Sequence, residues 1–263
     1  MTRPDARRVK LVVCVGTGTI GSSWAAYFLA SGFDVVATDP APDAEEKLDR
    51  NIGDAWPKLE RLGLSDGADR ARLTFTPDLS RAVSGAEFIQ ESAPDDEGLK
   101  TDLMAEIDAA APADTVIASS SSEFLPSRIG AKCKYPWRVV IGHPFVPVHL
   151  IPLVEVVGAE DTDPDVLDWA MGFYTAIGKR PIRLKKEIEA YVANRLQRAI
   201  FAEALSLVGQ GICGFDDIDD GVTWGPGSDG PFRDLPSPGI SAGERGAFGS
   251  SSRTSAGAAA RQG

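Results

Sequence analysis

The stretch Lys10-Leu-Val-Val-Cys-Val-Gly-Thr-Gly-Thr-Ile-Gly21 decides the fold of this chain. Its apolar run is typical of a strand that is buried on both faces of a parallel sheet. The glycines that follow have the GxGxxG spacing: the first permits a tight turn, the second a close approach to phosphates, and the third close packing of helix on strand. The pattern predicts that the turn and the helix after it, from Gly16 and Gly18 through Thr19 and Ile20 to Gly21, bind a dinucleotide.

The acidic residue Asp39 stands at the end of the next predicted strand. A carboxylate at this place accepts hydrogen bonds from the adenosine ribose and repels a 2′-phosphate, which favours NAD over NADP. Two simpler interpretations remain open. GxGxxG alone is a weak signal, and Asp39 can merely begin the Asp39-Pro40 turn. Strand, glycines, helix, strand and acid in this order favour NAD as the cofactor, with an NADP-dependent reductase as the alternative.

Strand-like and helix-like segments alternate through the first two thirds of the chain. This alternation predicts an α/β fold with a Rossmann-type doubly wound, mostly parallel sheet. We expect strands at 10–15, 34–38, 73–75, 86–91, 115–118, 138–141, 153–157 and 180–184, and helices at 20–31, 44–62 (with a breaker at Pro57), 102–110 and 164–177. A long amphipathic helix at 191–208 has no strand after it and predicts the start of an all-α C-terminal domain.

Three domains are therefore expected: residues 1–187 bind NAD, residues 188–227 begin a helical domain for substrate and dimerisation, and residues 228–263 form a low-complexity tail. The tail is poor in large apolar residues and cannot bury enough surface to offset the entropy lost on ordering.

Bulk composition excludes several classes of function. The 263 residues carry a net charge of -11, which argues against a nucleic-acid or anionic-membrane surface. The three cysteines are far apart and show no spacing typical of metal ligands, so we expect no metal site. The first apolar run is too short to span a membrane and lacks a signal-peptide cleavage region. A cytoplasmic location is the expectation.

The two histidines of the chain lie in one corner, Gly142-His-Pro-Phe-Val-Pro-Val-His149. His143 ends an apolar strand, so its ring can project from the carboxyl edge of the sheet, where α/β folds bind ligands. Glu155 interrupts the next apolar run, and a buried carboxylate needs a partner because desolvating an isolated charge is costly. We expect Glu155 to pair with His143 as an acid–base dyad. The alternative is a solvent-facing Glu155 and an ordinary turn histidine.

Two further polar residues are candidates for the same edge. Ser122 closes the cluster Ser119-Ser-Ser-Ser122 after a predicted strand, although serine clusters are more often polar turns. Asn194 stands early in the predicted long helix, where it could equally be a surface amide.

Several ordered motifs together resemble the 3-hydroxyacyl-CoA dehydrogenase family. The resemblance covers roughly residues 9–227 and includes Val15-Gly-Thr-Gly-Thr-Ile-Gly21, Gln90-Glu-Ser-Ala-Pro94, Ala118-Ser-Ser-Ser-Ser122, Gly142-His-Pro-Phe145, Ile151-Pro-Leu-Val-Glu-Val-Val-Gly158, Ile177-Gly-Lys179 and Asn194-Arg-Leu-Gln197. Three segments are similar in sequence to the short branch of the family that holds L-gulonate 3-dehydrogenase (lambda-crystallin) and L-carnitine dehydrogenase. They are Gln90–Pro94, Phe124-Leu-Pro-Ser127 and Glu187-Ile-Glu-Ala-Tyr191.

The resemblance implies a reversible oxidation of an L-3-hydroxyacyl-CoA or an L-3-hydroxy acid to its 3-keto form, with hydride passing to NAD. It implies His143 as the base, Glu155 as its orienting carboxylate, and Ser122 and Asn194 as groups near the substrate oxygen and nicotinamide. It also implies cofactor contacts at Glu91 and Lys100, and a homodimer. The alternative is an NAD-binding protein without turnover, either a truncated pseudoenzyme or a crystallin-like protein.

The sequence departs from the family pattern at several positions. Val146 stands where the family has Asn, Asp95 where it has Glu, and Ala190-Tyr191 where it has Gly-Phe. After Gly227 the expected helices are missing, yet a shifted reading frame of permitted codons spells family-like fragments such as Leu-Arg-Trp-Ala. We expect a frameshifted remnant there, or else a natural low-complexity tail; the coding DNA distinguishes the two.

Overall fold

The computed structural model describes residues 5–224 of the chain. The expectation for the tail, residues 228–263, lies outside the described residues. The chain divides into two compact units after Gln197, and the described residues of these units are 5–197 and 198–224. The domain boundary expected at residue 187 stays a prediction. Among the described residues, no helix is long and apolar enough to cross a membrane.

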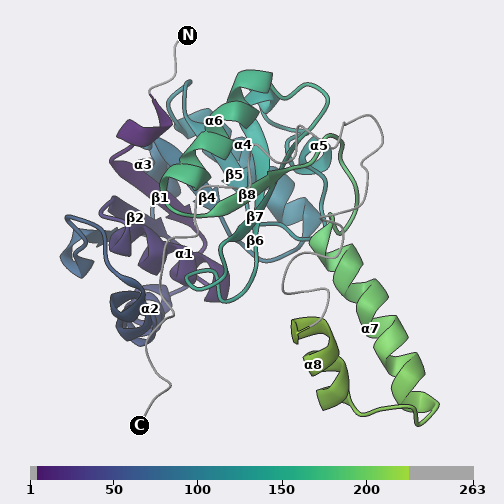
Figure 1. Cartoon of the computed structure of the whole chain (residues 1–263). Coiled ribbons are helices and arrows are strands. Elements are labelled where there is room, and N and C mark those ends of the chain that lie inside the picture. Colours follow the sequence, from purple (N-terminus) through teal and green to yellow (C-terminus); the bar gives the residue numbers. More distant parts are fainter. Residues whose placement is uncertain (1–4, 225–263) are drawn as a thin grey trace, which may run out of the picture. The chain divides into compact units, whose positions relative to one another are not determined.

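An eight-stranded sheet forms the centre of the first unit (Figure 1). Its strands are β1 (Leu11–Val15), β2 (Asp34–Thr38), β3 (Leu73–Phe75), β4 (Phe88–Glu91), β5 (Val116–Ser119), β6 (Val139–Pro144), β7 (Leu153–Gly158) and β8 (Arg180–Arg183). Their spatial order is β3-β2-β1-β4-β5-β6-β7-β8. Every neighbouring pair is parallel except β6 and β7, which are antiparallel. The predicted Rossmann-type, mostly parallel sheet is confirmed.

The helices are α1 (Thr19–Ala30), α2 (Ala44–Leu62), α3 (Leu79–Val83), α4 (Glu97–Ala110), α5 (Pro126–Ile129), α6 (Pro164–Ala176), α7 (Ala193–Gly209) and α8 (Phe215–Trp224). The short helices α3 and α5, and α8, have no counterpart among the helices expected from the sequence. The breaker expected at Pro57 was wrong, because α2 runs through it. Buried Leu48, Ile52 and Leu59 lie on both sides of that proline, and their packing outweighs the lost backbone bond.

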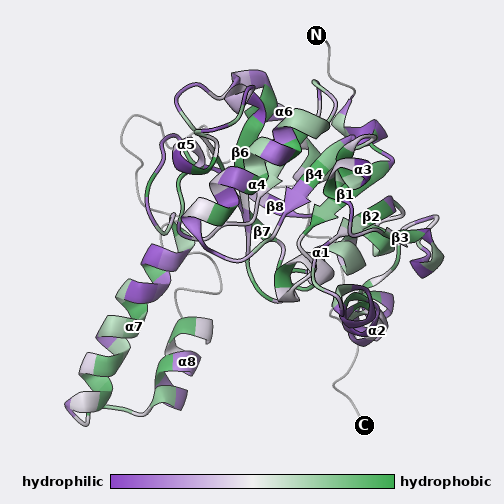
Figure 2. Cartoon of the chain, turned by 180° about the vertical axis from the view of Figure 1, so that it is seen from behind, coloured by the Kyte–Doolittle hydropathy of each residue, from purple (hydrophilic) through white to green (hydrophobic). Residues whose placement is uncertain are grey.

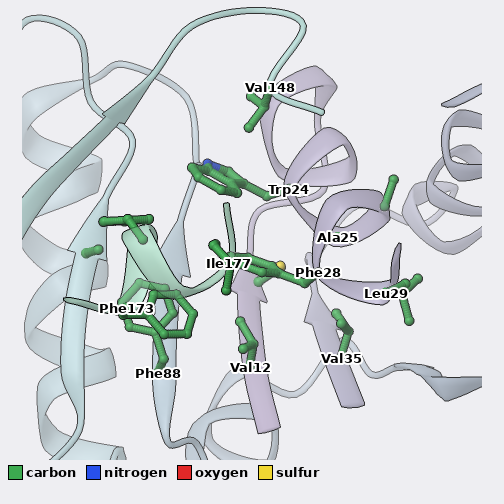
Figure 3. Close-up of a cluster of buried hydrophobic side chains, with 14 of the residues drawn as sticks. Val12, Trp24, Ala25, Phe28, Leu29, Val35, Phe88, Val148, Phe173 and Ile177 are labelled. Carbon is green, nitrogen blue, oxygen red and sulfur yellow. The ribbon is translucent and has the colours of Figure 1, made fainter. Parts of the chain in front are cut away.

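Two apolar clusters cover the two faces of the sheet. Alternate residues of β1 divide between them: Val12 and Cys14 join the cluster with α1, α2 and α6, whereas Val13 and Val15 join the cluster with α3, α4 and α5. Figure 3 shows the first cluster. Figure 2 shows the strands mostly in apolar colours, while α2 displays mainly hydrophilic residues in that view. Burial on both faces explains why the strands read as continuous apolar runs.

The strand order reverses between β1 and β4, and this switch point locates the ligand crevice of such folds at the carboxyl ends of the strands. The glycine turn after β1 and the loop after β4 meet there, because the N–H of Ser92 donates to the carbonyl of Val15 (2.7 Å).

The second unit is described from Arg198 to Trp224, which includes most of α7 and all of α8. Large apolar side chains are exposed on both helices, among them Phe201 (61%) and Trp224 (80%). An apolar surface of this kind marks a place where further protein can pack.

Candidate active site

The glycine turn is held by steric constraints. Gly16 has a φ of +84°, and a Cβ there would lie 2.8 Å from backbone atoms of Ser92 and Ala93. A Cβ on Gly21 would lie 1.8 Å from the carbonyl oxygen of Gly16, so α1 approaches the turn as closely as backbone permits. A Cβ on Gly18 would meet nothing within 4 Å. Two glycines are therefore required by the protein itself, whereas the third faces open space at the start of a helix.

Two cavities open beside this turn, and both include Gly16 and Asp39 in their lining. The smaller, about 310 Å³, also includes Gly18, Thr19, Ile20 and Lys100. The larger, about 660 Å³, extends toward α4 and is lined mainly by apolar groups. Of the predicted cofactor contacts, only Gly21 and Glu91 lie outside both linings.

The Asp39 carboxylate combines the two roles that the sequence left open. Its Oδ2 accepts hydrogen bonds from the N–H (2.8 Å) and the hydroxyl (3.2 Å) of Thr17, inside the glycine turn. Its Oδ1 accepts from the N–H of Ala41 (3.0 Å), which is the expected local turn. A carboxylate has about four acceptor positions, and this half-buried one also borders both cavities. It retains capacity for a ribose hydroxyl.

Glu91 holds Lys100, which lines the smaller cavity. Its side chain is fully enclosed: Oε1 accepts from Lys100 Nζ (2.9 Å) and from the N–H of Ala93 (2.6 Å), and Oε2 accepts from the Ser119 hydroxyl. Lys100 also donates to the carbonyl of Ala93 (2.9 Å). Glu91 lies outside both cavity linings, and its direct contact with the cofactor stays a prediction. Lys100 does reach the smaller cavity.

The predicted dyad is present in the structure. His143 and Glu155 stand directly opposite each other in the antiparallel pair of β6 and β7, and His143 Nδ1 lies 2.8 Å from Glu155 Oε2. Glu155 is fully buried and His143 is 4% exposed. An ionised carboxylate only accepts, so Nδ1 is the donor in this pair, and in a neutral ring the lone pair is then on Nε2. No protein group among residues 5–224 bonds to that Nε2.

The segment before α7 completes the surroundings of the dyad. Glu155 Oε1 accepts from the N–H groups of Val192 and Ala193, both at 2.9 Å. The Tyr191 ring lies 5.3 Å from the His143 ring, and its hydroxyl donates to the carbonyl of Phe124 (2.6 Å). Burial, together with the charges of Asp95, Glu155 and Glu187, raises the pKa of Tyr191, so the phenol stays neutral.

The bend at Ala190 and Tyr191 has a constrained backbone geometry. Ala190 has a φ of +57° and Tyr191 a φ of +45°, in the left-handed region that favours glycine. This tight bend delivers the two N–H groups that hold Glu155.

The other two predicted catalytic residues have fewer contacts. Ser122 is half-buried beyond the end of β5, and its hydroxyl donates to Asp95 Oδ2 (3.3 Å). Asn194 is half-buried in the first turn of α7, with no side-chain hydrogen bond inside residues 5–224. The structure does not record a contact between either residue and the dyad.

Sequence reasoning missed a buried polar network centred on Gln90. Its Nε2 donates to the Ser120 hydroxyl (2.9 Å), and its Oε1 accepts from Tyr174 (2.6 Å). Ser120 also accepts from Trp24 Nε1 (3.2 Å) and bonds to Ser92. The network ties β4, β5 and α1 together beside the smaller cavity. The signal was present: Gln90 interrupts an apolar strand just as Glu155 does.

These features fit a dinucleotide. The open space beside Gly18 accommodates a pyrophosphate, the first N–H groups of α1 have no intrahelical partners, and the carboxylate of Asp39 borders both cavities. In the part of the chain that the structure describes, no group of three or more His, Cys, Asp or Glu residues could hold a metal ion.

Comparisons with known proteins give the same assignment. Residues 11–188 match the family described as 3-hydroxyacyl-CoA dehydrogenase, NAD binding domain. L-carnitine dehydrogenase of Streptomyces griseus is 52% identical over 219 residues, which make up 83% of this chain and 65% of that protein. L-carnitine dehydrogenase of Burkholderia mallei is 48% identical over 220 residues, 84% of this chain and 68% of that protein. The match with the Streptomyces griseus protein thus spans less than two thirds of its length.

Solved structures agree. The NAD+-dependent dismutase 5-formyl-3-hydroxy-2-methylpyridine 4-carboxylic acid 5-dehydrogenase has a TM-score of 0.76 at 32% identity, over 86% of this chain and 72% of that chain. A diketoreductase has a TM-score of 0.75 at 32% identity, over 86% and 82%. This chain therefore belongs to the 3-hydroxyacyl-CoA dehydrogenase family and carries that family's NAD-binding domain.

Proposed function

We propose that this chain oxidises the hydroxyl group of an L-3-hydroxy acid to a ketone with NAD, and that its substrate is L-carnitine. The observation that carries the proposal is the buried His143–Glu155 pair at the carboxyl edge of the sheet that carries the glycine turn. Eight relatives named L-carnitine dehydrogenase, at 45% to 52% identity, support a small hydroxy acid over a CoA thioester.

In this reaction the hydroxyl proton passes to His143 Nε2 while the C3 hydride leaves the substrate. NAD, when bound, supplies the hydride acceptor. Glu155 fixes the tautomer and stabilises the imidazolium that forms, since its Oε2 accepts from Nδ1. The backbone donors at Val192 and Ala193 fix the other carboxylate oxygen, so Glu155 cannot rotate away. Ser122 and Asn194 are proposed to bond the substrate oxygen and to face the nicotinamide side.

Formation of NADH by the purified chain tests the proposal. The substrate panel is L-carnitine, D-carnitine, L-gulonate and L-3-hydroxybutyryl-CoA, and we expect turnover with L-carnitine above the other three. His143→Ala should lower kcat by at least about 10²-fold and leave the Kd for NAD nearly unchanged. Asp34→Ala, which alters an exposed residue at the amino end of β2, should retain turnover. Equal loss of turnover and NAD binding in His143→Ala would make His143 a structural residue.

A second candidate is an NAD-binding protein without turnover. The observation that favours it is that the match spans only 65% of the Streptomyces griseus relative, so the remaining length of that protein has no counterpart in the match. NAD binding in calorimetry, combined with no NADH formation on any member of the panel, would establish this second function.

A homodimer is also proposed. The exposed apolar residues of α7 and α8, including Ile200, Phe201 and Phe215, support an association that covers them. Light scattering on the purified chain tests it: a mass of one chain at micromolar concentration would contradict the proposal, and a mass of two chains is expected.

A further inference from the structure

The connector between β6 and β7, residues 145–152, joins the two members of the dyad. His143 lies at the end of β6 and Glu155 near the start of β7, so their 2.8 Å contact depends on how this connector is held. Inside it, the N–H groups of Leu150 and Ile151 both donate to the carbonyl of Pro147, at 3.0 and 2.9 Å. The connector has local order, but a loop of this length needs anchors to the body of the protein.

Lys179 provides such an anchor. Its Nζ donates to the carbonyls of Val148 and Ile151, the latter at 3.0 Å. The same nitrogen lies 3.8 Å from the centroid of the Tyr27 ring and 5.3 Å from that of Trp24. Two carbonyls and one aromatic face therefore occupy its three N–H directions.

The surroundings show that Lys179 is not an ordinary surface lysine. It is 3% exposed, and no carboxylate of the described residues lies within 4 Å of its Nζ. The next residue, Arg180, donates its N–H to the carbonyl of Pro152 (2.8 Å) and begins the pairing of β8 with β7. Lys179 thus fastens the connector beside the point where the strand of Glu155 is itself held.

A second anchor acts on the same connector from α1. The Ser23 hydroxyl bonds to His149 Nδ1 (2.7 Å) and accepts from the His149 N–H (3.1 Å). Val148 is fully buried above Trp24, as Figure 3 shows. The connector is therefore fixed at Val148, His149 and Ile151, and Lys179 reaches two of its carbonyls from outside.

We propose that Lys179 is a positioning residue that fastens the connector 145–152 and so holds His143 opposite Glu155. The proposal rests on the proposed function only in calling these two residues a catalytic dyad; the fastening itself is independent of turnover. Lys179 touches neither the dyad nor the cofactor cavities, so it acts through the connector.

Protonation gives this anchor a measurable signature. Burial lowers the pKa of Lys179 to about 7, so the closed connector disfavours the charged form relative to an open state in which the lysine is in water. Between about pH 7 and the ordinary lysine pKa, the open state binds more protons than the closed state. Closing of the connector therefore becomes more favourable as the pH rises. A neutral amine still has two N–H donors for the two carbonyls.

Other titratable groups that face Lys179 leave this pH window clear. On α1, burial raises the pKa of Tyr27 above its ordinary value of 10.0. On the connector, burial and the charges of Lys58 and Lys179 lower the pKa of His149 below 6.5. Lys58 on α2 is exposed and lies beside the connector in a cavity that also includes His149. Between pH 7 and 9, Lys179 is the group expected to change.

Amide hydrogen exchange of Leu150 and Ile151 tests the proposal in the full chain. After correction for intrinsic exchange, we expect their protection in the wild type to rise between pH 7 and 9, with a slope that approaches tenfold per pH unit. Lys179→Met should lose this slope and exchange at least about tenfold faster at pH 9. Lys58→Met, a matched lysine that faces the same connector from outside, should behave like the wild type.

A second readout follows the dyad directly. The chain has two histidines, so ¹⁵N-histidine labelling gives two rings, and the Nδ1 proton of His143 reports its bond to Glu155. We expect that signal to persist in Lys58→Met and to broaden in Lys179→Met. A flat protection profile in the wild type between pH 7 and 9 would overturn the proposal, even if Lys179→Met does not fold. Neither readout needs turnover. An inactive chain that shows the expected rise of amide protection with pH would therefore contradict only the dehydrogenase proposal.

Discussion

The glycine turn (residues 16–21) and the dyad corner (His143, Glu155 and the backbone that binds Glu155) both need a fixed position at one edge of the sheet. They achieve it by opposite means. The turn contains no charge, and its shape is enforced by backbone contacts that leave no room for a Cβ at Gly16 or Gly21. The corner is enforced by buried polar groups, with Glu155 fully enclosed and bonded through both oxygens. A substitution in the turn is therefore expected to destabilise by steric clash. A substitution in the corner is expected to destabilise by leaving buried donors and acceptors unpaired.

The largest effect is expected from breaking the corner. Glu155→Leu leaves the Nδ1–H of His143 and two backbone N–H groups without partners, and should lower the free energy of unfolding by about 3–5 kcal/mol. Urea denaturation measures it. Glu155→Gln keeps the shape and one acceptor, so its cost should be about 1–3 kcal/mol. A loss below about 1 kcal/mol for the leucine variant would mean that the carboxylate is not a stabilising part of the corner.

Breaking the turn should cost somewhat less. Gly21→Val places atoms against the Gly16 carbonyl, where even a Cβ lies at 1.8 Å, and should destabilise by about 1–3 kcal/mol while abolishing NAD binding. Gly18→Ala is the matched control, because its Cβ meets no protein atom within 4 Å. It should change unfolding by less than about 0.5 kcal/mol and still weaken NAD binding, as calorimetry would show. Unchanged NAD affinity in Gly18→Ala would place the cofactor elsewhere.

Asp39 holds the glycine turn through hydrogen bonds to Thr17. Its removal should have a smaller effect than breaking the turn or the corner. Asp39→Ala removes bonds to Thr17 and Ala41 and the repulsion of a 2′-phosphate. We expect about tenfold weaker NADH binding and a smaller loss for NADPH. Asp34→Ala, at the other end of β2 and paired with Arg72, should change neither affinity. Tighter NADPH than NADH binding by the wild type would support an NADP-dependent enzyme instead.

The smallest effect is expected at the bend before α7. Ala190→Gly removes a Cβ from a residue with a φ of +57° and should raise the free energy of unfolding by up to about 1 kcal/mol. Thermal unfolding measures the gain. Ala202→Gly, in the interior of α7, should instead destabilise by about 1 kcal/mol. Destabilisation by Ala190→Gly would mean that its buried methyl group contributes more through packing than it costs in strain.

Much of this architecture was predictable because its signals are local. The apolar run before Gly16, the glycine spacing and the acidic residue Asp39 predicted β1, α1 and β2. The structure has these elements where they were expected. Glu155 in an apolar strand predicted a buried partner by an argument from desolvation alone. The same argument applies to Gln90, whose buried amide bonds Ser120 and Tyr174.

The sequence by itself determined the order of elements, the glycine turn and the need of Glu155 for a partner, because these depend on neighbouring residues or on the cost of burying a charge. Only the tertiary structure decided that Ser120 rather than Ser122 joins the buried network, that Glu91 is enclosed behind the cofactor cavity, and that Lys179 reaches the connector. Those contacts join residues far apart in the chain. Their distances depend on strand order and helix packing, which no local pattern encodes.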